Sequence, residues 1–182
     1  EMLAPRRLLD DGSRTPGKYL PGRRGEDPLQ VIQFMNFKGG SAKSTSAIHL
    51  CHYLALNGYR VLAVDLDPQG SMTGFCGIQT ELEFDGTSVY DALRYDDPLP
   101  MHEAIVQTYF PGLDLAPAKL VLSEFETETA VNAGRGVAFF ERLSAALATV
   151  EQDYDVVVID SPPALGFLTL TGLYAATSVI VP

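Results

Sequence analysis

The chain has 182 residues, 46% of them apolar, which suits one α/β domain with a substantial core and is too short for two domains. Its net charge of −10 argues against a broad nucleic-acid-binding face. No segment approaches the ~18 uninterrupted apolar residues of a membrane span and no apolar signal-peptide core opens the chain, so we expect a cytoplasmic protein without membrane contact. Cys51 and Cys76, the only cysteines, lack redox or metal-binding spacing and are expected to be buried free thiols.

Residues 1–29 are expected to form a linker or arm. Four prolines and four glycines interrupt this segment, and its apolar residues follow neither a helical nor an alternating pattern. The first residue is Glu1 rather than Met, so we expect that the natural protein extends further upstream.

Residues 31–45, VIQFMNFKGGSAKST, predict a phosphate-binding loop. Residues 31–35 are apolar apart from one glutamine and suit a strand buried on both faces, whereas helical spacing begins at Ser44. Gly39 and Gly40 therefore lie at a strand-to-helix turn. Glycine allows a positive φ and a close approach there, so that several backbone N–H groups can converge on one anion.

Two side chains after the glycines suit the rest of a nucleotide site. Lys43 is placed to reach the β- and γ-phosphates, and the Ser44 hydroxyl to bind the Mg²⁺ that bridges them. The usual pattern G-x-x-x-x-G-K-[ST] is not matched, because Phe37 and Ala42 stand at its two glycine positions, and a second lysine, Lys38, precedes the glycine pair. A plain glycine turn between a strand and a helix is the alternative that this stretch leaves open.

The next predicted strand, residues 61–65, is apolar until it ends at Asp65, and Asp67 follows on the loop. The carboxyl ends of neighbouring strands in an open α/β sheet face one crevice, so both carboxylates are expected beside the phosphate loop. There they could hold Mg²⁺ through water or orient an attacking water. The alternative is a loop cap without a catalytic role. His49 and His52, on the intervening helix, are expected at the surface or core edge rather than on a metal.

The middle of the chain, residues 72–135, has a weaker pattern. Ser88 and Asp91 have the spacing of a capping box at a helix start. Glu124, Glu126 and Glu128 are expected on a solvated helix face rather than in a metal site, because alternating positions do not converge on one side of a helix. A further amphipathic helix is predicted by the spacing of Phe140, Leu143, Leu147 and Val150.

A second fully apolar strand, residues 156–159, ends on Asp160 and is stopped by Pro162 and Pro163. A carboxylate at this strand tip, beside the phosphate loop, is placed to bind a Mg²⁺-coordinated water. A last helix is expected over residues 167–176 and another strand from Val179, with the sequence ending mid-sheet. The chain therefore predicts an α/β fold, a mostly parallel sheet with helices on both faces that is incomplete at its C-terminus.

With KGGSAKS, DLDPQ and DSPP in this order, the chain resembles the ParA/MinD family of deviant Walker A ATPases, which are P-loop NTPases. MNFKGGSAKST, YFPGLDLAPAKL and DYDVVVIDSPPALGFLTL are similar, more particularly, to the RepA group of ParA-type partition proteins from repABC plasmids. The resemblance implies that residues 30–182 are the N-terminal part of the ATPase domain. It also implies that residues 1–29 are the remnant of an upstream DNA-binding region.

The resemblance implies roles for individual residues. Lys38 would reach the partner's phosphates across an ATP-bound homodimer, Lys43 would serve the nucleotide of its own subunit, and Asp67 would position the attacking water. The implied metal-site residues are Ser44, Asp65 and Asp160. The implied nucleotide-binding residues are Lys38, Gly39, Gly40, Ser41, Ala42, Lys43, Ser44 and Thr45.

The implied activity is slow hydrolysis of ATP to ADP and phosphate with Mg²⁺, stimulated by a ParB-like partner, RepB. The ATP-bound dimer of such proteins binds DNA without sequence preference, associates with the bacterial nucleoid and moves plasmid copies apart, and autorepression of the operon is also implied.

Three alternatives follow from this resemblance. Ala42 replaces the family's glycine, and a left-handed backbone there would cost ~1 kcal/mol. A nucleotide-sensing DNA-binding repressor with negligible hydrolysis is therefore one alternative. The membrane-tethered sibling needs a C-terminal amphipathic helix, which residues 1–182 cannot show. The iron-protein sibling needs cluster-ligating cysteines that Cys51 and Cys76 do not resemble.

Overall fold

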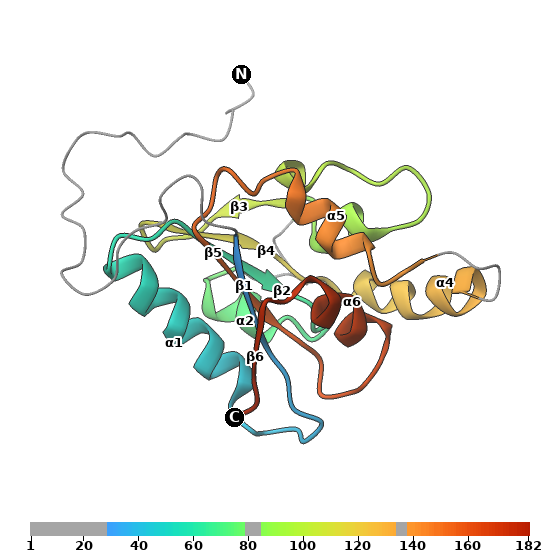
Figure 1. Ribbon diagram of the computed structural model, residues 1–182, viewed down its shortest axis with the longest axis horizontal. Coiled ribbons are helices and arrows are strands. Elements are labelled where there is room, and N and C mark those ends of the chain that lie inside the picture. The colour runs from blue at the N-terminus through green and yellow to red at the C-terminus, as the bar shows by residue number, and fades with distance from the viewer. Residues whose placement is uncertain (1–28, 79–84, 134–137) are drawn as a thin grey trace.

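The computed structural model describes residues 29–78, 85–133 and 138–182, which form a six-stranded sheet in the order β3-β4-β2-β5-β1-β6 (Figure 1). The strands are β1 (Gln30–Phe34), β2 (Val61–Asp65), β3 (Val106–Gln107), β4 (Leu113–Ala116), β5 (Val156–Asp160) and β6 (Ser178–Ile180). Neighbouring strands are parallel except for the edge pair of β3 and β4, which is antiparallel. The predicted mostly parallel sheet is therefore confirmed. The expected arm lies outside the described residues apart from Leu29.

Three parallel strands end at the same level of the sheet. β5 lies between β1 and β2, and its last residue, Asp160, is level with Phe34 of β1 and with Asp65 of β2. Because the three strands point the same way, the loops that follow them leave the sheet at one edge. The phosphate loop, which follows β1, is thus directly beside the loop that follows β5, while the loop that follows β2 lies one strand further away.

Helices cover both faces of the sheet, as the apolar strands require. β2 and β5 are buried along their whole length, which explains why their sequences read as continuous apolar runs. Figure 1 shows α1 on one side of the sheet and α5 and α6 on the other. The helices are α1 (Lys43–Leu56), α2 (Ser71–Phe75), α3 (Val89–Leu93), α4 (Glu124–Ala133), α5 (Arg142–Ala148) and α6 (Phe167–Ala175), with 3₁₀ turns η1 (Met101–Ala104) and η2 (Leu120–Ser123). Every helix in this described part of the chain is too short or too polar to cross a membrane.

The longest helix, α1, ends where the sequence predicts. The side chain of Asn57 donates to the carbonyl of Tyr53 (2.7 Å), and Gly58 follows with φ 86°. A left-handed glycine after the last turn lets the chain leave the helix without a Cβ clash. The buried stripe of α1 includes Ala47 and Cys51, which confirms the predicted amphipathic pattern.

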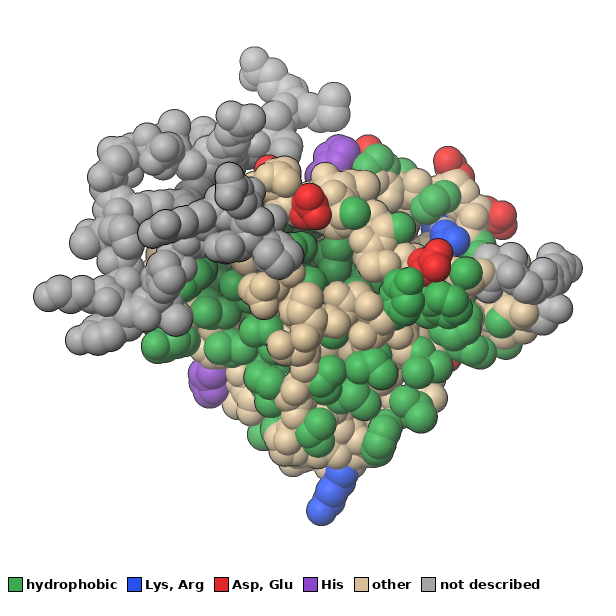
Figure 2. Space-filling model, in the orientation of Figure 1, with side chains coloured by type: hydrophobic (Ala, Val, Ile, Leu, Met, Phe, Trp, Pro, Cys, Tyr) green, Lys and Arg blue, Asp and Glu red, His purple; other side chains and the backbone are tan. Residues whose placement is uncertain are grey.

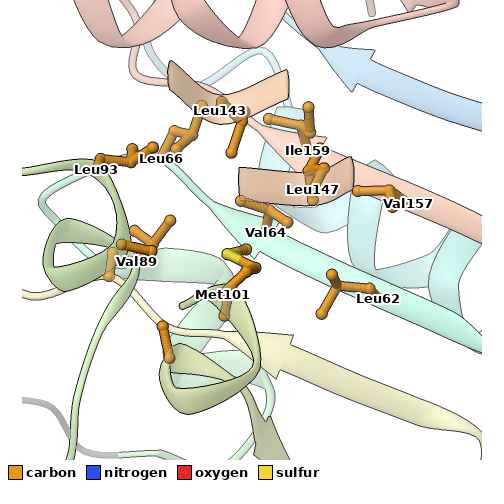
Figure 3. Close-up of a cluster of buried hydrophobic side chains, with 14 of the residues drawn as sticks. Leu62, Val64, Leu66, Val89, Leu93, Met101, Leu143, Leu147, Val157 and Ile159 are labelled. Carbon is orange, nitrogen blue, oxygen red and sulfur yellow. The ribbon is translucent and has the colours of Figure 1, made fainter. Parts of the chain in front are cut away.

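The core has two parts, one on each face of the sheet. On the α1 side it includes both cysteines, which are free and buried as expected. On the opposite side, Figure 3 shows side chains of β2 and β5 meeting those of α3, α5 and η1. The labelled residues are Leu62, Val64, Leu66, Val89, Leu93, Met101, Leu143, Leu147, Val157 and Ile159.

The structure confirms one local expectation and corrects two. The capping box at Ser88 and Asp91 is present at the start of α3. The solvated face expected for the glutamates of α4 is wrong for Glu126 and Glu128, which are half-buried and accept hydrogen bonds from other elements. Phe140 precedes α5 instead of joining its buried stripe, because its ring packs against Tyr174 of α6 with centroids 5.0 Å apart.

Candidate functional site

The loop between β1 and α1 has the backbone of an anion-binding site. Gly40 has φ 73° and Ala42 has φ 62° with ψ 25°, so both residues are left-handed. Beyond the chain neighbours, no heavy atom lies within 4 Å of a Cβ built on Gly39 or Gly40, so the space beside these glycines is open. α1 begins at Lys43 without a side-chain cap or an acidic residue in its first turn. Its free N–H groups and positive dipole end therefore favour a bound anion.

Ala42 adopts the left-handed conformation whose cost the sequence analysis anticipates. In this conformation the Cβ of an alanine crowds the following carbonyl oxygen, which costs about 1 kcal/mol and which glycine avoids. Ala42 is also exposed, so its methyl group gains no burial there. The loop keeps the shape of a phosphate cradle although one of its glycine positions holds an alanine.

The buried polar atoms without a hydrogen-bond partner among the described residues include Ser41 Oγ and both carboxylate oxygens of Asp160, which lie at this edge of the sheet. Buried polar atoms are normally paired, because leaving one unpaired costs about 1–3 kcal/mol. Asp160 is completely buried, so bulk water does not serve its oxygens directly. A hydrated cation bound beside a phosphate chain would supply the missing partners.

Asp160 lies near three predicted site residues, each of which affects its pKa. Burial raises the pKa of Asp160 to about 6, the Ser44 hydroxyl and the Lys43 ammonium lower it, and the Asp67 carboxylate raises it. Ser44 is close enough to act on this pKa, although its hydroxyl does not form a hydrogen bond of normal geometry with Asp160. Lys43 is itself buried, with 7% of its surface exposed. The structure therefore brings Lys43, Ser44, Asp67 and Asp160 together.

Asp65 is fully buried, and both of its carboxylate oxygens are already bonded within the protein. Oδ1 accepts from the Asp67 N–H (3.1 Å), and Oδ2 accepts from the Thr73 N–H and hydroxyl (2.8 Å each). Burial raises the pKa of Asp65 to about 7, with a further rise from the charge of Asp160, whereas the bonds from Thr73 and Asp67 lower it. In this structure Asp65 anchors the loop after β2 and the start of α2.

Asp67 combines a structural contact with a place at the site. Its Oδ1 accepts from the Gln69 N–H (3.0 Å), which is an Asx-type turn contact. The loop-cap alternative therefore describes part of what Asp67 does. Its charge also raises the pKa of Asp160, so its carboxylate lies near the buried Asp160 side chain.

Among the predicted nucleotide-binding residues, Lys38 and Thr45 have exposed side chains larger than a methyl group. The Lys38 N–H donates to the Asn36 side chain (2.9 Å), which shapes the loop before the glycines. Figure 2 shows a basic side chain projecting from the end of the molecule at which Figure 1 places the β1–α1 loop. Lys38 is exposed, whereas Lys43 is buried.

The described residues contain no group of three or more His, Cys, Asp or Glu side chains arranged to hold a metal ion by themselves. A single carboxylate such as Asp160 suits Mg²⁺ at a nucleotide site, since Mg²⁺ is usually held there by one or two carboxylates together with waters and substrate phosphates. The two histidines of α1 match their expectation. His49 is exposed, and His52 stacks on Phe110 with ring centroids 4.3 Å apart.

Sequence reasoning missed three residues that hold the site loops: Gln33, Thr73 and Glu126. Gln33 Nε2 donates to the hydroxyl of Ser161 (2.5 Å), the residue directly after Asp160. Thr73 ties Asp65 to the segment after β4, because its hydroxyl also accepts from the Ala118 N–H (3.0 Å). A glutamine in an otherwise apolar strand is a visible signal for Gln33. The contacts of Thr73 and Glu126 join distant parts of the chain and leave no local pattern.

The fold and this strand-to-helix loop define a P-loop nucleotide-binding protein. The family model AAA_31, described as an AAA domain, matches residues 29–182. The chain therefore belongs to this AAA domain family, and its relatives place it among the ParA-type proteins.

The relatives that match the chain are longer proteins. It is 50% identical over 188 residues to a protein named as a replication protein A of Sinorhizobium fredii, covering 100% of this chain and 46% of that protein. It is 40% identical over 157 residues to the chromosome partitioning protein ParA of Caulobacter vibrioides, covering 86% of this chain and 56% of that protein. The chain thus spans about half the length of the curated relatives it matches.

A solved structure also resembles the chain. This Mycobacterium smegmatis protein, described as a cobyrinic acid a,c-diamide synthase with bound ATP analog and magnesium, superposes with a TM-score of 0.75 at 41% identity. The match covers 85% of this chain and 59% of that protein.

Proposed function

We propose that this chain is the nucleotide-binding part of a ParA-type ATPase that hydrolyses ATP to ADP and phosphate with Mg²⁺ and serves as a switch in plasmid partition. Membership of the family supports a partition ATPase in general. The magnesium and ATP analog in the Mycobacterium smegmatis protein support the nucleotide and the metal.

The observation that carries the proposal is the Asp160 carboxylate, completely buried and without a protein partner for either oxygen. It lies beside Lys43 and Ser44 at the uncapped start of α1. Carboxylate and hydroxyl oxygens are the hard ligands that Mg²⁺ prefers, and the adjacent helix end favours phosphate. The residues present therefore fit both groups.

Each site residue has a role in this proposal. Lys43 and the backbone N–H groups of residues 39–45 would bind the phosphate chain, while Ser44 and Asp160 would hold Mg²⁺ directly or through water. Bound Mg²⁺ would neutralise charge on the β- and γ-phosphates. Asp67 would orient the attacking water, and Asp65 would keep Asp67 and α2 in place through the bonds described above. Lys38, which is exposed, would serve the phosphates of a facing subunit.

The whole protein's behaviour belongs to the same proposal. ATP binding would bring two subunits together, the dimer would bind DNA without sequence preference on the bacterial nucleoid, and a ParB-like partner would stimulate hydrolysis. Autorepression of the operon would use the same nucleotide switch. Exposed Lys38 beside an open loop supports the dimer, since a lysine in that place can reach a second molecule.

Steady-state hydrolysis by the complete protein tests the proposal. Turnover should require Mg²⁺ and should fall by about 100-fold or more in Lys38→Ala and in Asp67→Ala, because each residue would act on the transition state. Exposed Glu103→Ala is a suitable control and should hydrolyse ATP like the wild type. Unchanged turnover in either site variant would count decisively against the proposal.

A second function is favoured by one observation, the left-handed alanine at position 42. If this strained position prevents the loop from closing on the γ-phosphate, the protein is a nucleotide-sensing DNA-binding repressor. ATP would then change operator binding although wild-type turnover would be no faster than that of Lys43→Ala. The same hydrolysis assay, with that variant added, separates the two functions.

A further inference from the structure

The segment that leads from Asp160 into α6 is held by a helix outside the nucleotide site. Glu126 of α4 accepts two hydrogen bonds at the start of α6, one from the Phe167 N–H to Oε2 and one from the Leu168 N–H to Oε1, both 2.9 Å. A carboxylate at this position satisfies two N–H groups that the helix cannot satisfy itself. It also places a negative charge at the positive end of the helix dipole.

Gly166 provides the space for this carboxylate. A Cβ built on Gly166 would lie 2.4 Å from Glu126 Oε1 and 2.9 Å from Glu126 Cδ. The backbone at Gly166 is extended, with φ −96° and ψ −175°, so a larger residue could adopt it. The glycine is therefore needed for the close approach of Glu126 and not for an unusual backbone angle.

Side chains of Thr169 and Gln33 also hold residues 161–166, the Asp160 loop. The Thr169 hydroxyl donates to the Ala164 carbonyl (2.6 Å). Gln33 Nε2 donates to the Ser161 hydroxyl (2.5 Å) and to the Thr169 carbonyl (3.2 Å). Ala164 is thus fixed to α6 directly, Ser161 is fixed to Gln33 of β1, which also bonds α6, and α6 is fixed to α4 through Glu126. Among these contacts Glu126 supplies the charge.

We propose that Glu126 is a positioning residue for the Mg²⁺–nucleotide site, an inference that rests on the proposed function. Because no hydrogen bond of normal geometry from the described residues holds the Asp160 carboxylate, its direction depends largely on the backbone on either side of it. β5 and the Leu66 N–H, which donates to the Asp160 carbonyl (2.8 Å), fix one side. The other side is fixed by the Ser161 N–H, which donates to the Phe34 carbonyl (3.3 Å), and by the rest of the Asp160 loop. Glu126 holds this loop by occupying the start of α6, and so sets where the Asp160 oxygens meet the hydrated metal.

The test compares Glu126→Gln with Glu124→Gln in the complete protein. The first change keeps the side-chain size but turns one acceptor into an N–H₂ group that faces a backbone N–H. The second removes the same charge from an exposed position on the same helix, where the oxygen is 3.5 Å from the Tyr90 hydroxyl. Three quantities are measured in each variant: amide hydrogen exchange at Phe167 and Leu168 without nucleotide, the Mg²⁺ concentration that half-saturates ATP binding, and the ATP affinity without Mg²⁺.

Glu126→Gln should speed exchange at both amides and raise the half-saturating Mg²⁺ concentration on the order of 10-fold, the effect usual for groups that hold a metal ligand in place. ATP affinity without Mg²⁺ should stay at the wild-type value, because Glu126 does not touch the phosphate loop. Glu124→Gln should leave all three quantities unchanged.

Gly166→Ala provides an independent route to the same effect. Its new methyl group displaces the Glu126 carboxylate, so the half-saturating Mg²⁺ concentration should rise by a similar factor although Glu126 is intact. In a Glu126→Ala background the methyl has no carboxylate to displace, and Gly166→Ala should add no more than about twofold. Full additivity of the two changes would contradict a shared mechanism.

The remaining outcomes separate this inference from the proposed function. Faster exchange with an unchanged Mg²⁺ requirement means that Glu126 only caps α6, and unchanged exchange means that it does not hold the loop; either result overturns the inference while the ATPase proposal stands. A wild-type protein whose ATP binding ignores Mg²⁺ overturns the proposed function and this inference together.

Discussion

At the scale of single residues, the site contains two features that are unfavourable in an isolated fold. Ala42 has a left-handed backbone, and Asp160 has a buried carboxylate without a partner. Strained or unpaired groups tend to persist at binding sites, where a ligand completes them. The sequence reveals the alanine at position 42 through its departure from the glycine pattern. For Asp160 the sequence reveals only the position, because its burial and lack of a partner depend on how β1, β2 and α1 fold around it.

Replacing Ala42 with glycine tests the strain directly. We expect Ala42→Gly to raise the free energy of unfolding by roughly 1 kcal/mol, since glycine adopts a φ of 62° without a Cβ clash. Urea unfolding followed by circular dichroism measures this change. Ala145→Gly on the exposed side of α5 is the matched control and should lower the same free energy by roughly 1 kcal/mol, because that alanine has right-handed helical geometry. Destabilisation by both changes would argue against strain at Ala42.

At the scale of elements, the site depends on β2 and β5 ending side by side in aspartates. Asp65 and Asp160 are register partners, and both are fully buried. Burial raises the pKa of both carboxyls, to about 7 for Asp65 and about 6 for Asp160, from 3.8 in an ordinary aspartate. The carboxyls of Asp65 and Asp160 therefore stay protonated in the folded protein at pH values at which they are ionised in the unfolded chain.

This difference predicts how stability depends on pH when Mg²⁺ and nucleotide are absent. The folded state binds more protons than the unfolded state between pH about 4 and about 7, so the free energy of unfolding should fall as pH rises through that window. The free energy of unfolding, measured with urea in the presence of a chelator, should be lower at about pH 8 than at about pH 5 by more than about 1 kcal/mol because of these two carboxyls. Asp160→Asn should reduce the difference, because its amide does not titrate. A stability that rises over this range, or an unchanged slope in the variant, would contradict the raised pKa values.

The sequence predicts these elements well and the contacts between them poorly. Residues 61–65 and 156–160 are predictable because strands buried on both faces must be apolar throughout, and each ends visibly at an aspartate. The prediction that the glutamates of α4 face solvent is wrong for Glu126, because charge spacing on one helix cannot reveal that the start of another helix, at Phe167, packs against it. Phe140 was misplaced for the same reason, since its partner Tyr174 comes from another helix.

At the scale of the whole molecule, one edge of the sheet brings together loops that are far apart in the sequence. The order β2-β5-β1 places the Asp160 loop between the phosphate loop and the Asp65 loop. Helix α4 supports this edge from outside, through Glu126 at the start of α6.

The most direct measurement of the central claim is ATP affinity with and without Mg²⁺, by calorimetric titration of the wild type, Asp160→Asn and Lys43→Ala. Mg²⁺ should tighten ATP binding to the wild type by about 10-fold or more and should have little effect on Asp160→Asn, while Lys43→Ala should weaken binding in both conditions. If Mg²⁺ tightened ATP binding to Asp160→Asn as much as to the wild type, or if Lys43→Ala bound ATP like the wild type, these loops would not form one magnesium–nucleotide site.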